Sequence, residues 1–253
     1  MRTNISIIGV GEIGGTVLED MSKLNRDNIT AVDTNQDRLR ELSDKYKISD
    51  IIRPSEVYII CVYKSEQVLQ VLHNIKLLHQ AGTYPKPLTI IESTIDYSKI
   101  DDLLEYQEEQ ELIAFPHRFN PNDPEHRCFN LHRVIGAVTE TGMKRAIQFY
   151  ERYINSTLLT PTTFQNAILC KSMENTYRFV EIAIAQSLAL SHPNFEEVRK
   201  LCNTKWNIDI KEPRYGIYSK CLNKDLDFVR AIAKNPFLEL AYTEDKKYKE
   251  KKG

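Results

Sequence analysis

Four glycines gather near the start of a chain that holds only nine glycines among its 253 residues. The segment Gly9-Val-Gly-Glu-Ile-Gly14 has the spacing G-x-G-x-x-G and directly follows the β-branched run Asn4 to Ile8. In a strand-turn-helix unit, such glycines allow a tight turn, close approach of a pyrophosphate to the backbone, and close helix-strand packing. The pattern therefore predicts a phosphate-binding turn at a helix N-terminus.

A carboxylate ends the next predicted strand, residues 29–33. Asp33 lies 19 residues after Gly14, where a carboxylate is placed to accept hydrogen bonds from the adenosine ribose hydroxyls. Because a carboxylate would repel a 2′-phosphate, NAD is predicted rather than NADP. Arg38 is the residue that could reverse this preference, and a strand-turn-helix unit without a ligand is the structural alternative.

Lys171 and Asn175 lie four residues apart on a long predicted helix, 163–191, so they project from one helix face. Apolar neighbours of Lys171 can lower a lysine pKa, which would let the amine orient a hydroxyl or a water for proton transfer. A lysine that merely extends to the helix border is the alternative, and periodicity alone favours it.

Cys221 stands between Lys220 and Lys224 in a segment that reads as a loop. Nearby positive charge lowers a thiol pKa and favours a nucleophile, although an inert cysteine remains the alternative. The five cysteines are scattered and contain no C-x-x-C pair, which argues against a disulfide framework and a thiolate zinc site. His117, His126 and His132 match no metal-ligand spacing, so we expect a polar loop there and no metal.

The elements that must position these residues alternate between strand and helix in the first part of the chain. We expect strands over 4–9, 29–33, 57–62, 88–91, 112–115 and 133–138, with helices over 12–24, 36–46, 66–79 and 140–153. This order predicts an α/β fold, a Rossmann-type doubly wound and mostly parallel sheet. The break at Thr160-Pro-Thr-Thr163 predicts three parts: an NAD-binding domain over 1–160, a smaller all-helical substrate and dimerisation domain over 161–243, and a lysine-rich flexible tail over 244–253.

The overall charge gives no basis for whole-molecule attraction to nucleic acid or membrane, because 34 Lys and Arg balance 35 Asp and Glu. The longest apolar run, Val57 to Tyr63, is too short to span a bilayer. The N-terminus shows no signal-peptide pattern, and we expect a cytoplasmic protein.

Taken in order, the motifs resemble the nucleotide-sugar dehydrogenases, the family of UDP-glucose, UDP-N-acetylmannosamine and GDP-mannose 6-dehydrogenases. The resemblance runs from residue 4 to about 230 and is carried by five segments: the glycine turn, Ile90-Ile-Glu-Ser-Thr-Ile95, Arg133-Val-Ile-Gly136, Lys171-Ser-Met-Glu-Asn-Thr-Tyr-Arg178 and Cys221-Leu-Asn-Lys-Asp225.

By this resemblance the protein is an NAD-dependent enzyme of polysaccharide biosynthesis that oxidises a primary alcohol of a sugar or nucleotide sugar to the carboxylate in two steps. Cys221 would attack the intermediate aldehyde and form a thiohemiacetal and then a thioester. Lys171 and Asn175 would hold the reacting oxygen, and Asp225 and Thr94 would position a water. The implied cofactor-binding residues are Gly9, Gly11, Glu12, Ile13, Gly14, Asp33, Val62 and Thr94.

Three departures from the family pattern stand out. The family has a C-terminal nucleotide-binding domain, and this sequence stops where the connecting helix would begin, so a partner chain would have to supply UDP recognition. Tyr218, Ser219 and Lys220 replace the family's Gly-Gly before the cysteine. His117 replaces a glutamate that assists thioester hydrolysis and could act as the base instead; Asn223 replaces a proline.

The family commonly dimerises through the long helix of its second domain. We therefore predict a homodimer through one face of residues 163–191, formed by Phe179, Ile182, Ala183, Ala185, Gln186 and Leu190. Two other functions stay open. One is a two-electron dehydrogenase of the β-hydroxyacid type, which shares the lysine-asparagine helix but needs no thiol. The other is a degenerate homologue that binds NAD and serves as a regulator or scaffold.

Overall fold

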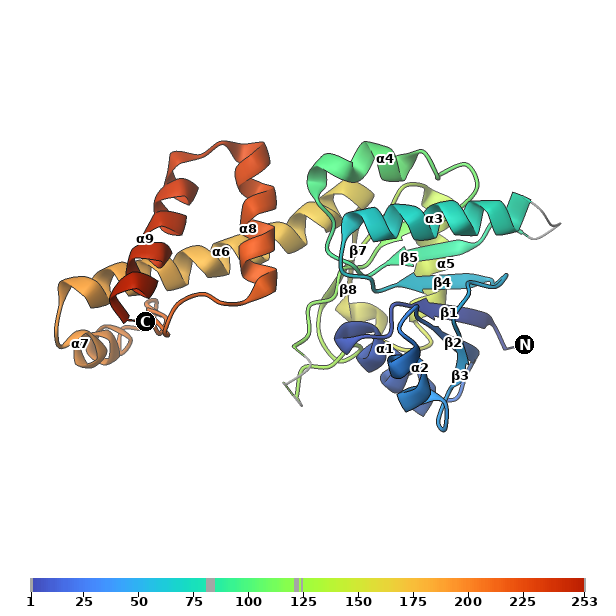
Figure 1. Ribbon diagram of the computed structural model, residues 1–253, viewed down its shortest axis with the longest axis horizontal. Helices are drawn as coiled ribbons and strands as arrows, with labels where there is room; N and C mark the ends of the chain where they lie inside the picture. The colour runs from blue at the N-terminus through green and yellow to red at the C-terminus, as the bar shows by residue number, and fades with distance from the viewer. Residues whose placement is uncertain (1, 81–84, 121–122, 124, 253) are drawn as a thin grey trace. The chain divides into compact units, whose positions relative to one another are not determined.

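The computed structural model describes residues 2–80, 85–120, 123 and 125–252. It divides into an N-terminal unit, Met1–Leu169, and a C-terminal unit, Cys170–Gly253 (Figure 1). The division falls within one long helix, somewhat beyond the boundary predicted near residue 160. Each unit has a core of its own and is described by itself.

The N-terminal unit is built on a single sheet. Its described residues form eight strands in the order β3-β2-β1-β4-β5-β6-β7-β8. The strands are parallel except for the antiparallel pair β6–β7, so the predicted doubly wound sheet is confirmed. Their bounds are β1 Asn4–Ile8, β2 Asn28–Val32, β3 Lys47–Ser49, β4 Val57–Ile60, β5 Leu88–Ile91, β6 Glu111–Ala114, β7 Arg133–Ala137 and β8 Leu159–Thr163.

Helices cover both faces of this sheet because successive strand residues point to opposite sides. In β4, Ile59 packs into a core with helices α1, α2 and α5, whereas Tyr58 and Ile60 pack into a second core with α3, α4 and the start of α6. Figure 1 shows α3 and α4 on the side of the sheet away from α1 and α2. The helix bounds are α1 Glu12–Lys23, α2 Gln36–Leu42, α3 Ser65–Gln80, α4 Ile100–Leu104, α5 Glu140–Tyr150 and α6 Phe164–Ser191.

Three elements of the N-terminal unit differ from the sequence prediction. Strand β3 and helix α4 are short and were not predicted. Strand β8 runs through Thr160 to Thr163, where the sequence predicts a break. A proline is compatible with β8 because the strand lies at the edge of the sheet, where a backbone N–H is not needed for pairing.

The C-terminal unit is helical, as predicted. Besides most of α6, it contains α7 Phe195–Cys202, α8 Lys220–Ala233 and α9 Pro236–Lys252. Its core joins Phe179, Ile182 and Ala183 of α6 to apolar residues of α8 and α9. The predicted dimer face is therefore wrong: Phe179, Ile182, Ala183, Ala185 and Gln186 are buried within the chain itself.

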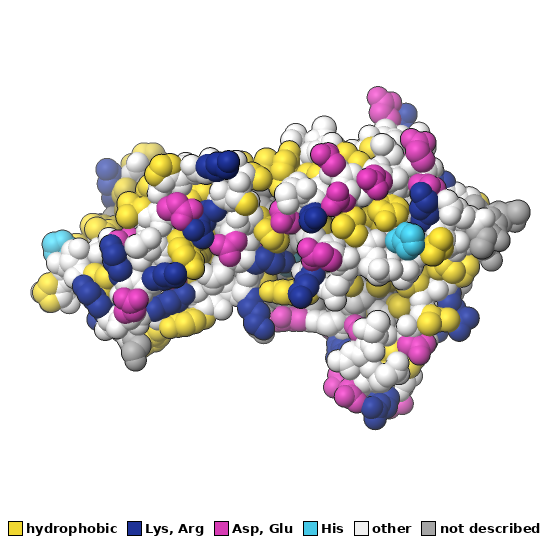
Figure 2. All heavy atoms as spheres, turned by 45° about the horizontal axis from the view of Figure 1, so that its top comes forward, with side chains coloured by type: hydrophobic (Ala, Val, Ile, Leu, Met, Phe, Trp, Pro, Cys, Tyr) yellow, Lys and Arg dark blue, Asp and Glu magenta, His cyan; other side chains and the backbone are white. Residues whose placement is uncertain are grey.

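The tail that the sequence predicts to be flexible is helical through Lys252. Two of its side chains, Asp245 and Tyr248, are buried and hold it against the rest of the unit. On the face drawn in Figure 2 the C-terminal unit exposes hydrophobic side chains between basic ones. None of the described helices is both long enough and apolar enough to cross a bilayer.

Candidate active site

The glycine turn connects β1 to α1 and is shaped by two close backbone contacts. Gly9 has a φ of +85°, and a Cβ atom there would lie 3.0 Å from the carbonyl of Cys61. A Cβ on Gly14 would lie 2.0 Å from the carbonyl oxygen of Gly9. Both positions therefore need glycine for the fold itself.

Gly11 differs from these two glycines because a Cβ there would meet no described atom within 4 Å. It precedes Glu12 and Ile13 as the N-cap of α1, and no described side chain caps this end of the helix. The start of α1 thus has no side-chain cap among the described residues, which suits a pyrophosphate at the helix N-terminus. Packing does not explain glycine at position 11, whereas close approach of a ligand would.

Asp33 follows β2 and contacts the turn directly. Its Oδ2 accepts a hydrogen bond from the Val10 amide at 2.9 Å, and its Oδ1 accepts one from the Asn35 amide at 2.9 Å. The carboxylate is therefore fixed beside the glycine turn, where the sequence predicts contact with a ribose.

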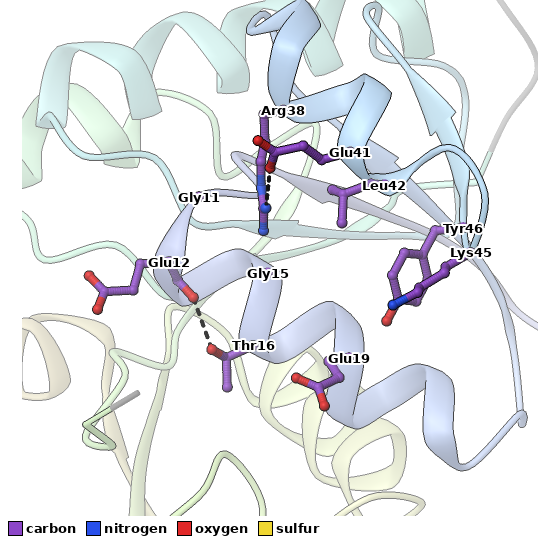
Figure 3. Close-up of a pocket in the computed structure, with 10 residues that line it drawn as sticks. All are labelled: Gly11, Glu12, Gly15, Thr16, Glu19, Arg38, Glu41, Leu42, Lys45 and Tyr46. Carbon is purple, nitrogen blue, oxygen red and sulfur yellow. Dashed lines mark hydrogen bonds and ion pairs between the residues drawn. The ribbon is translucent and has the colours of Figure 1, made fainter. Parts of the chain in front are cut away.

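Arg38 also joins the turn to α2. Its Nε donates to the Val10 carbonyl at 2.7 Å, and its Nη1 pairs with Glu41 at 2.8 Å. A Cβ on Gly15 would lie 2.7 Å from the Nη2 of Arg38, the end of a flexible side chain, and 3.5 Å from the Val10 carbonyl oxygen. Figure 3 shows the hollow between α1 and α2 that these residues line, about 770 Å³ in volume.

Two further predicted residues follow neighbouring parallel strands, whose carboxyl ends meet at one edge of a sheet. Val62 comes just after β4, and its Cγ1 would lie 3.0 Å from a Cβ on Gly9. Thr94 comes just after β5 and is buried. Since β4 pairs with β1 and β5 pairs with β4, these residues share the edge of the glycine turn.

His117 follows β6 at the same edge. Its amide donates to the carbonyl oxygen of Glu92 at 3.4 Å, and its Nδ1 lies 3.2 Å from that same oxygen. His126 instead pairs with Asp123, and Pro121, Asn122 and Pro124 of this polar segment lie outside the described residues. Within the described ranges, no three His, Cys, Asp or Glu side chains gather as a metal ion would require.

The C-terminal unit brings Asn175 and Asp225 together. Asn175 Nδ2 on α6 donates to Asp225 Oδ2 on α8 at 2.5 Å. The other carboxylate oxygen, Oδ1, is buried and has no hydrogen-bond partner among the residues described. Burial raises the pKa of Asp225 above its ordinary value, and the hydrogen bond from Asn175 and the charges of Lys224 and Lys171 oppose this rise. A buried, incompletely bonded carboxylate is a binding position for a hydroxyl or a water.

Cys221 lies in the first turn of α8 rather than in the predicted loop, because Ser219 caps the helix by accepting from the Leu222 amide. The thiol is exposed. Cys221 precedes Asp225 by one helical turn, so the two project from neighbouring positions of one face. Cys221 and Asp225 thus lie on adjacent turns of α8, and Asn175 contacts Asp225 from α6.

The segment before α8 is held by contacts that the sequence did not reveal. Asp245 Oδ1 on α9 accepts from the Ile217 amide at 2.8 Å, and Lys249 Nζ donates to the Ile217 carbonyl at 2.9 Å. Asn223, which stands in place of a proline, donates to the carbonyls of Ile217 and Ser219, at 2.9 Å each. The spacing of four residues between Asp245 and Lys249 is the sequence feature from which their ion pair could have been predicted.

Comparisons with known proteins show what the chain is similar to. Residues 5–54 match the model of the TrkA-N domain. Over 267 aligned residues the chain is 26% identical to a UDP-N-acetyl-D-mannosamine dehydrogenase of Methanocaldococcus jannaschii, covering 91% of this chain and 62% of the relative. The chain is a homologue of the nucleotide-sugar dehydrogenases. Its N-terminal unit is an NAD-binding Rossmann domain.

Solved structures extend the likeness of fold to both units. A UDP-D-ManNAc dehydrogenase of Pyrococcus horikoshii matches with a TM-score of 0.82 at 22% identity, over 97% of this chain and 68% of that one. A 3-hydroxyisobutyrate dehydrogenase of Mycobacterium tuberculosis matches with a TM-score of 0.75 at 15% identity, over 95% of this chain and 91% of that one. The chain thus spans about two thirds of the first protein and nearly all of the second.

Proposed function

We propose that this protein is an NAD-dependent dehydrogenase that oxidises the primary alcohol of a nucleotide sugar. The observation that carries the proposal is the hydrogen bond from the half-buried Asn175 to the buried Asp225, whose carboxylate keeps an oxygen without a partner among the described residues, one helical turn from an exposed thiol. Homology to enzymes named for UDP-N-acetyl-D-mannosamine supports a nucleotide sugar as the substrate class.

The cofactor would be held by the turn residues Gly9, Gly11 and Gly14, with Asp33 at the ribose. The open space at Gly11 and the uncapped amides of α1 fit a pyrophosphate. NAD would accept the hydride when bound, so that one alcohol, one water and two NAD+ give one carboxylate, two NADH and three protons. Asp33 would disfavour a 2′-phosphate, which makes NAD the better substrate than NADP.

The chain's own groups would perform the covalent steps. In the first oxidation, Lys171 and Asn175 hold the alcohol oxygen and stabilise its negative charge. The Cys221 thiolate then forms a C–S bond to the aldehyde carbon, and the second oxidation turns this thiohemiacetal into a thioester. By the family resemblance, Asp225 and Thr94 would position the water that attacks the thioester carbon, and His117 would accept its proton. The C–S bond breaks and the thiolate is restored.

A second candidate is a two-electron dehydrogenase of the β-hydroxyacid type. It is favoured by the match to 3-hydroxyisobutyrate dehydrogenase over nearly that protein's whole length. This reaction would use Lys171 and Asn175 in the same way but would not need Cys221. The thiol therefore separates the two candidates.

The test measures NAD binding by calorimetry and NADH absorbance with UDP-glucose, UDP-N-acetylmannosamine and GDP-mannose. We expect NAD binding, turnover of one of these sugars, and loss of the product acid in Cys221→Ser. Undiminished turnover in Cys221→Ser supports the two-electron reaction instead. NAD binding without turnover across the panel contradicts the oxidation of a nucleotide sugar; if 3-hydroxyisobutyrate is not turned over either, the second candidate also fails and a regulatory or scaffold protein is favoured.

A homodimer remains part of the proposal, through the other face of α6. Met173, Tyr177, Ile184 and Leu188 are exposed there, at spacings that place them on one side of the helix. A second copy of the chain, packed helix against helix, would cover this stripe. Light scattering should give the mass of a dimer, and Ile184→Glu should reduce it to that of a monomer, whereas an unchanged mass contradicts the assignment. The cytoplasmic location stays a prediction.

A further inference from the structure

An exposed aromatic ring stands three residues before the exposed thiol of Cys221. Tyr218 is 68% exposed, and it directly precedes Ser219, the N-cap of α8. Because three residues span at most about 11 Å even when the chain is fully extended, the tyrosine and the cysteine border the same part of the surface of the C-terminal unit. The ring is therefore within reach of a molecule that is bound at the thiol.

The ring of Tyr218 is held on one face by a cation. Nζ of Lys249 on α9 lies over the ring, 4.8 Å from its centroid, which is a favourable cation–π contact. The same amine pairs with Asp245 at 2.5 Å and donates to the Ile217 carbonyl at 2.9 Å, so its own position is fixed. Since this face is covered, the exposed area of Tyr218 lies on the opposite face and at the edge of the ring.

The backbone beside the ring is shaped to admit it. Gly216 has a φ of +127°, a conformation that residues with a side chain rarely adopt, and a Cβ there would lie 2.9 Å from Cε2 of Tyr218 and 2.6 Å from Cγ of Lys249. Arg214, two residues earlier, also has a positive φ, +57°. Backbone conformations of this kind cost free energy and cluster at functional sites.

Packing of the helix start does not explain the tyrosine. An apolar residue just before an N-cap often packs against the fourth residue of its helix. In α8 that residue is Asn223, whose side chain donates to the Ile217 and Ser219 carbonyls instead. A ring that stays mostly in water also buries little area on folding and so adds little stability. A fixed ring with an open face is better explained by a ligand that stacks on it.

We propose that Tyr218 is a specificity-determining residue whose open face stacks on the hexopyranose ring of the substrate. The inference rests on the proposed function, in which Cys221 bonds to the carbon attached to the sugar ring and so places that ring, rather than the nucleobase, nearest to the tyrosine. A hexopyranose carries most of its hydroxyls around its rim and C–H groups on its faces. The negative face of an aromatic ring attracts such C–H groups.

The fixed position of the ring favours binding for a second reason. Lys249 and the backbone at Gly216 hold Tyr218 before a sugar arrives, so little side-chain freedom is lost when the complex forms. The phenol hydroxyl has no role in this contact. Phenylalanine should therefore replace the tyrosine without loss of affinity, whereas a residue without a ring should not.

The test measures sugar binding to the full chain by saturation-transfer difference NMR, with mannose and N-acetylmannosamine as the probes. We expect transfer to the C–H protons of the sugar in the wild type, and a signal about fivefold weaker in Tyr218→Ala. Tyr218→Phe should keep the wild-type signal because it keeps the ring. Tyr215→Ala is the matched control, since Tyr215 is 83% exposed in the same segment and its loss should leave the signal unchanged.

The melting temperature of each variant shows that it is folded, and it should stay near that of the wild type because both tyrosines are exposed. Equal signals in the wild type and Tyr218→Ala overturn the inference. So do an equal loss in Tyr215→Ala and a wild type that transfers saturation to neither sugar. Because the measurement needs no NAD and no turnover, sugar binding that depends on Tyr218 without NADH formation would mean that the proposed oxidation fails while this inference holds.

Discussion

The sheet edge of the N-terminal unit and the Asn175–Asp225 cluster of the C-terminal unit are built differently. At the sheet edge, Asp33 and His117 are fixed by hydrogen bonds to the backbone, and the buried Glu92 is paired with Arg133. In the cluster, a buried oxygen of Asp225 has no partner among the described residues. These side chains of the sheet edge thus have partners within the unit, whereas the cluster has a carboxylate oxygen that a bound hydroxyl or water would satisfy.

The largest expected effect distinguishes two glycines of the turn. Gly14→Ala forces a Cβ to within 2.0 Å of the Gly9 carbonyl, so it should destabilise the N-terminal unit by about 2–3 kcal/mol and abolish NAD binding. Gly11→Ala meets no described atom within 4 Å, so its melting temperature should stay unchanged while NAD affinity falls. Thermal unfolding and calorimetry measure both. Equal melting temperatures for the two variants would contradict the distinction.

Asn175→Ala should remove a hydrogen bond of the cluster without touching the sheet edge. We expect kcat to fall about 100-fold and the NAD dissociation constant to stay constant, because Asn175 lies in the C-terminal unit and the cofactor turn does not. Asn166→Ala on the same helix is the matched control and should retain activity. A large change in NAD affinity in Asn175→Ala would show that the two regions are not separate in function.

Two carboxylates, Asp27 of the N-terminal unit and Asp225 of the cluster, should also respond to pH with opposite signs. Burial raises the pKa of Asp27, but hydrogen bonds from Tyr153, Thr3 and Arg152 outweigh it, so the pKa lies below its ordinary value. Its stabilisation is then present above the unfolded pKa of about 3.9 and is lost as pH falls. The pKa of Asp225 is raised, so its folded form favours the proton and loses relative stability as pH rises.

Replacement of each carboxylate by its amide tests these opposite dependences of stability on pH. At about pH 7 the melting temperature of Asp27→Asn should lie below that of the wild type, and this deficit should shrink as the pH falls below about 4. As the pH rises above about 4, Asp225→Asn should gain relative to the wild type. Thermal unfolding at several pH values measures both, and parallel trends would mean that the two carboxylates are in similar environments.

The smallest effect concerns the hold of α9 on the helix that carries Cys221. Lys249→Met removes the ion pair with Asp245 and the hydrogen bond to Ile217, which should lower stability by about 1 kcal/mol. In a Cys202→Ser background, the reaction of Cys221 with a thiol reagent should accelerate several-fold as the segment loosens. Lys247→Met, which loses only a pair with Glu244, should react at the parental rate; equal rates in both variants would exclude this role of α9.

The sequence predicted the glycine turn because its constraints are local. The strand, the three glycines and the later carboxylate all lie within residues 4–33. The residue types at these positions follow from local contacts of the backbone. The dimer face was not predictable in this way, because α6 is apolar on more than one side. By periodicity, Phe179 and Ile184 both belong to apolar faces of α6. The packing of α8 and α9 shows that the face with Phe179 is covered by the chain itself.

Residues that act across long sequence separations were the ones missed. In the sequence, Glu92 and Arg133 are recognised only as members of two family motifs. Neither motif indicates that these residues form an ion pair across 41 positions. The start of α8 depended on Ser219, one serine among many, so Cys221 was assigned to a loop. The contact of Asn175 with Asp225, 50 positions apart, was not predicted, although the family resemblance assigned both residues to one active site.

The central claim is that a thiol takes part in a two-step oxidation. It is tested most directly by the amount of NADH released from a limiting quantity of UDP-N-acetylmannosamine, together with the mass of the Cys221 peptide after acid quench. The account predicts two NADH for each sugar and a sugar adduct on Cys221. One NADH for each sugar with an unmodified cysteine would contradict it.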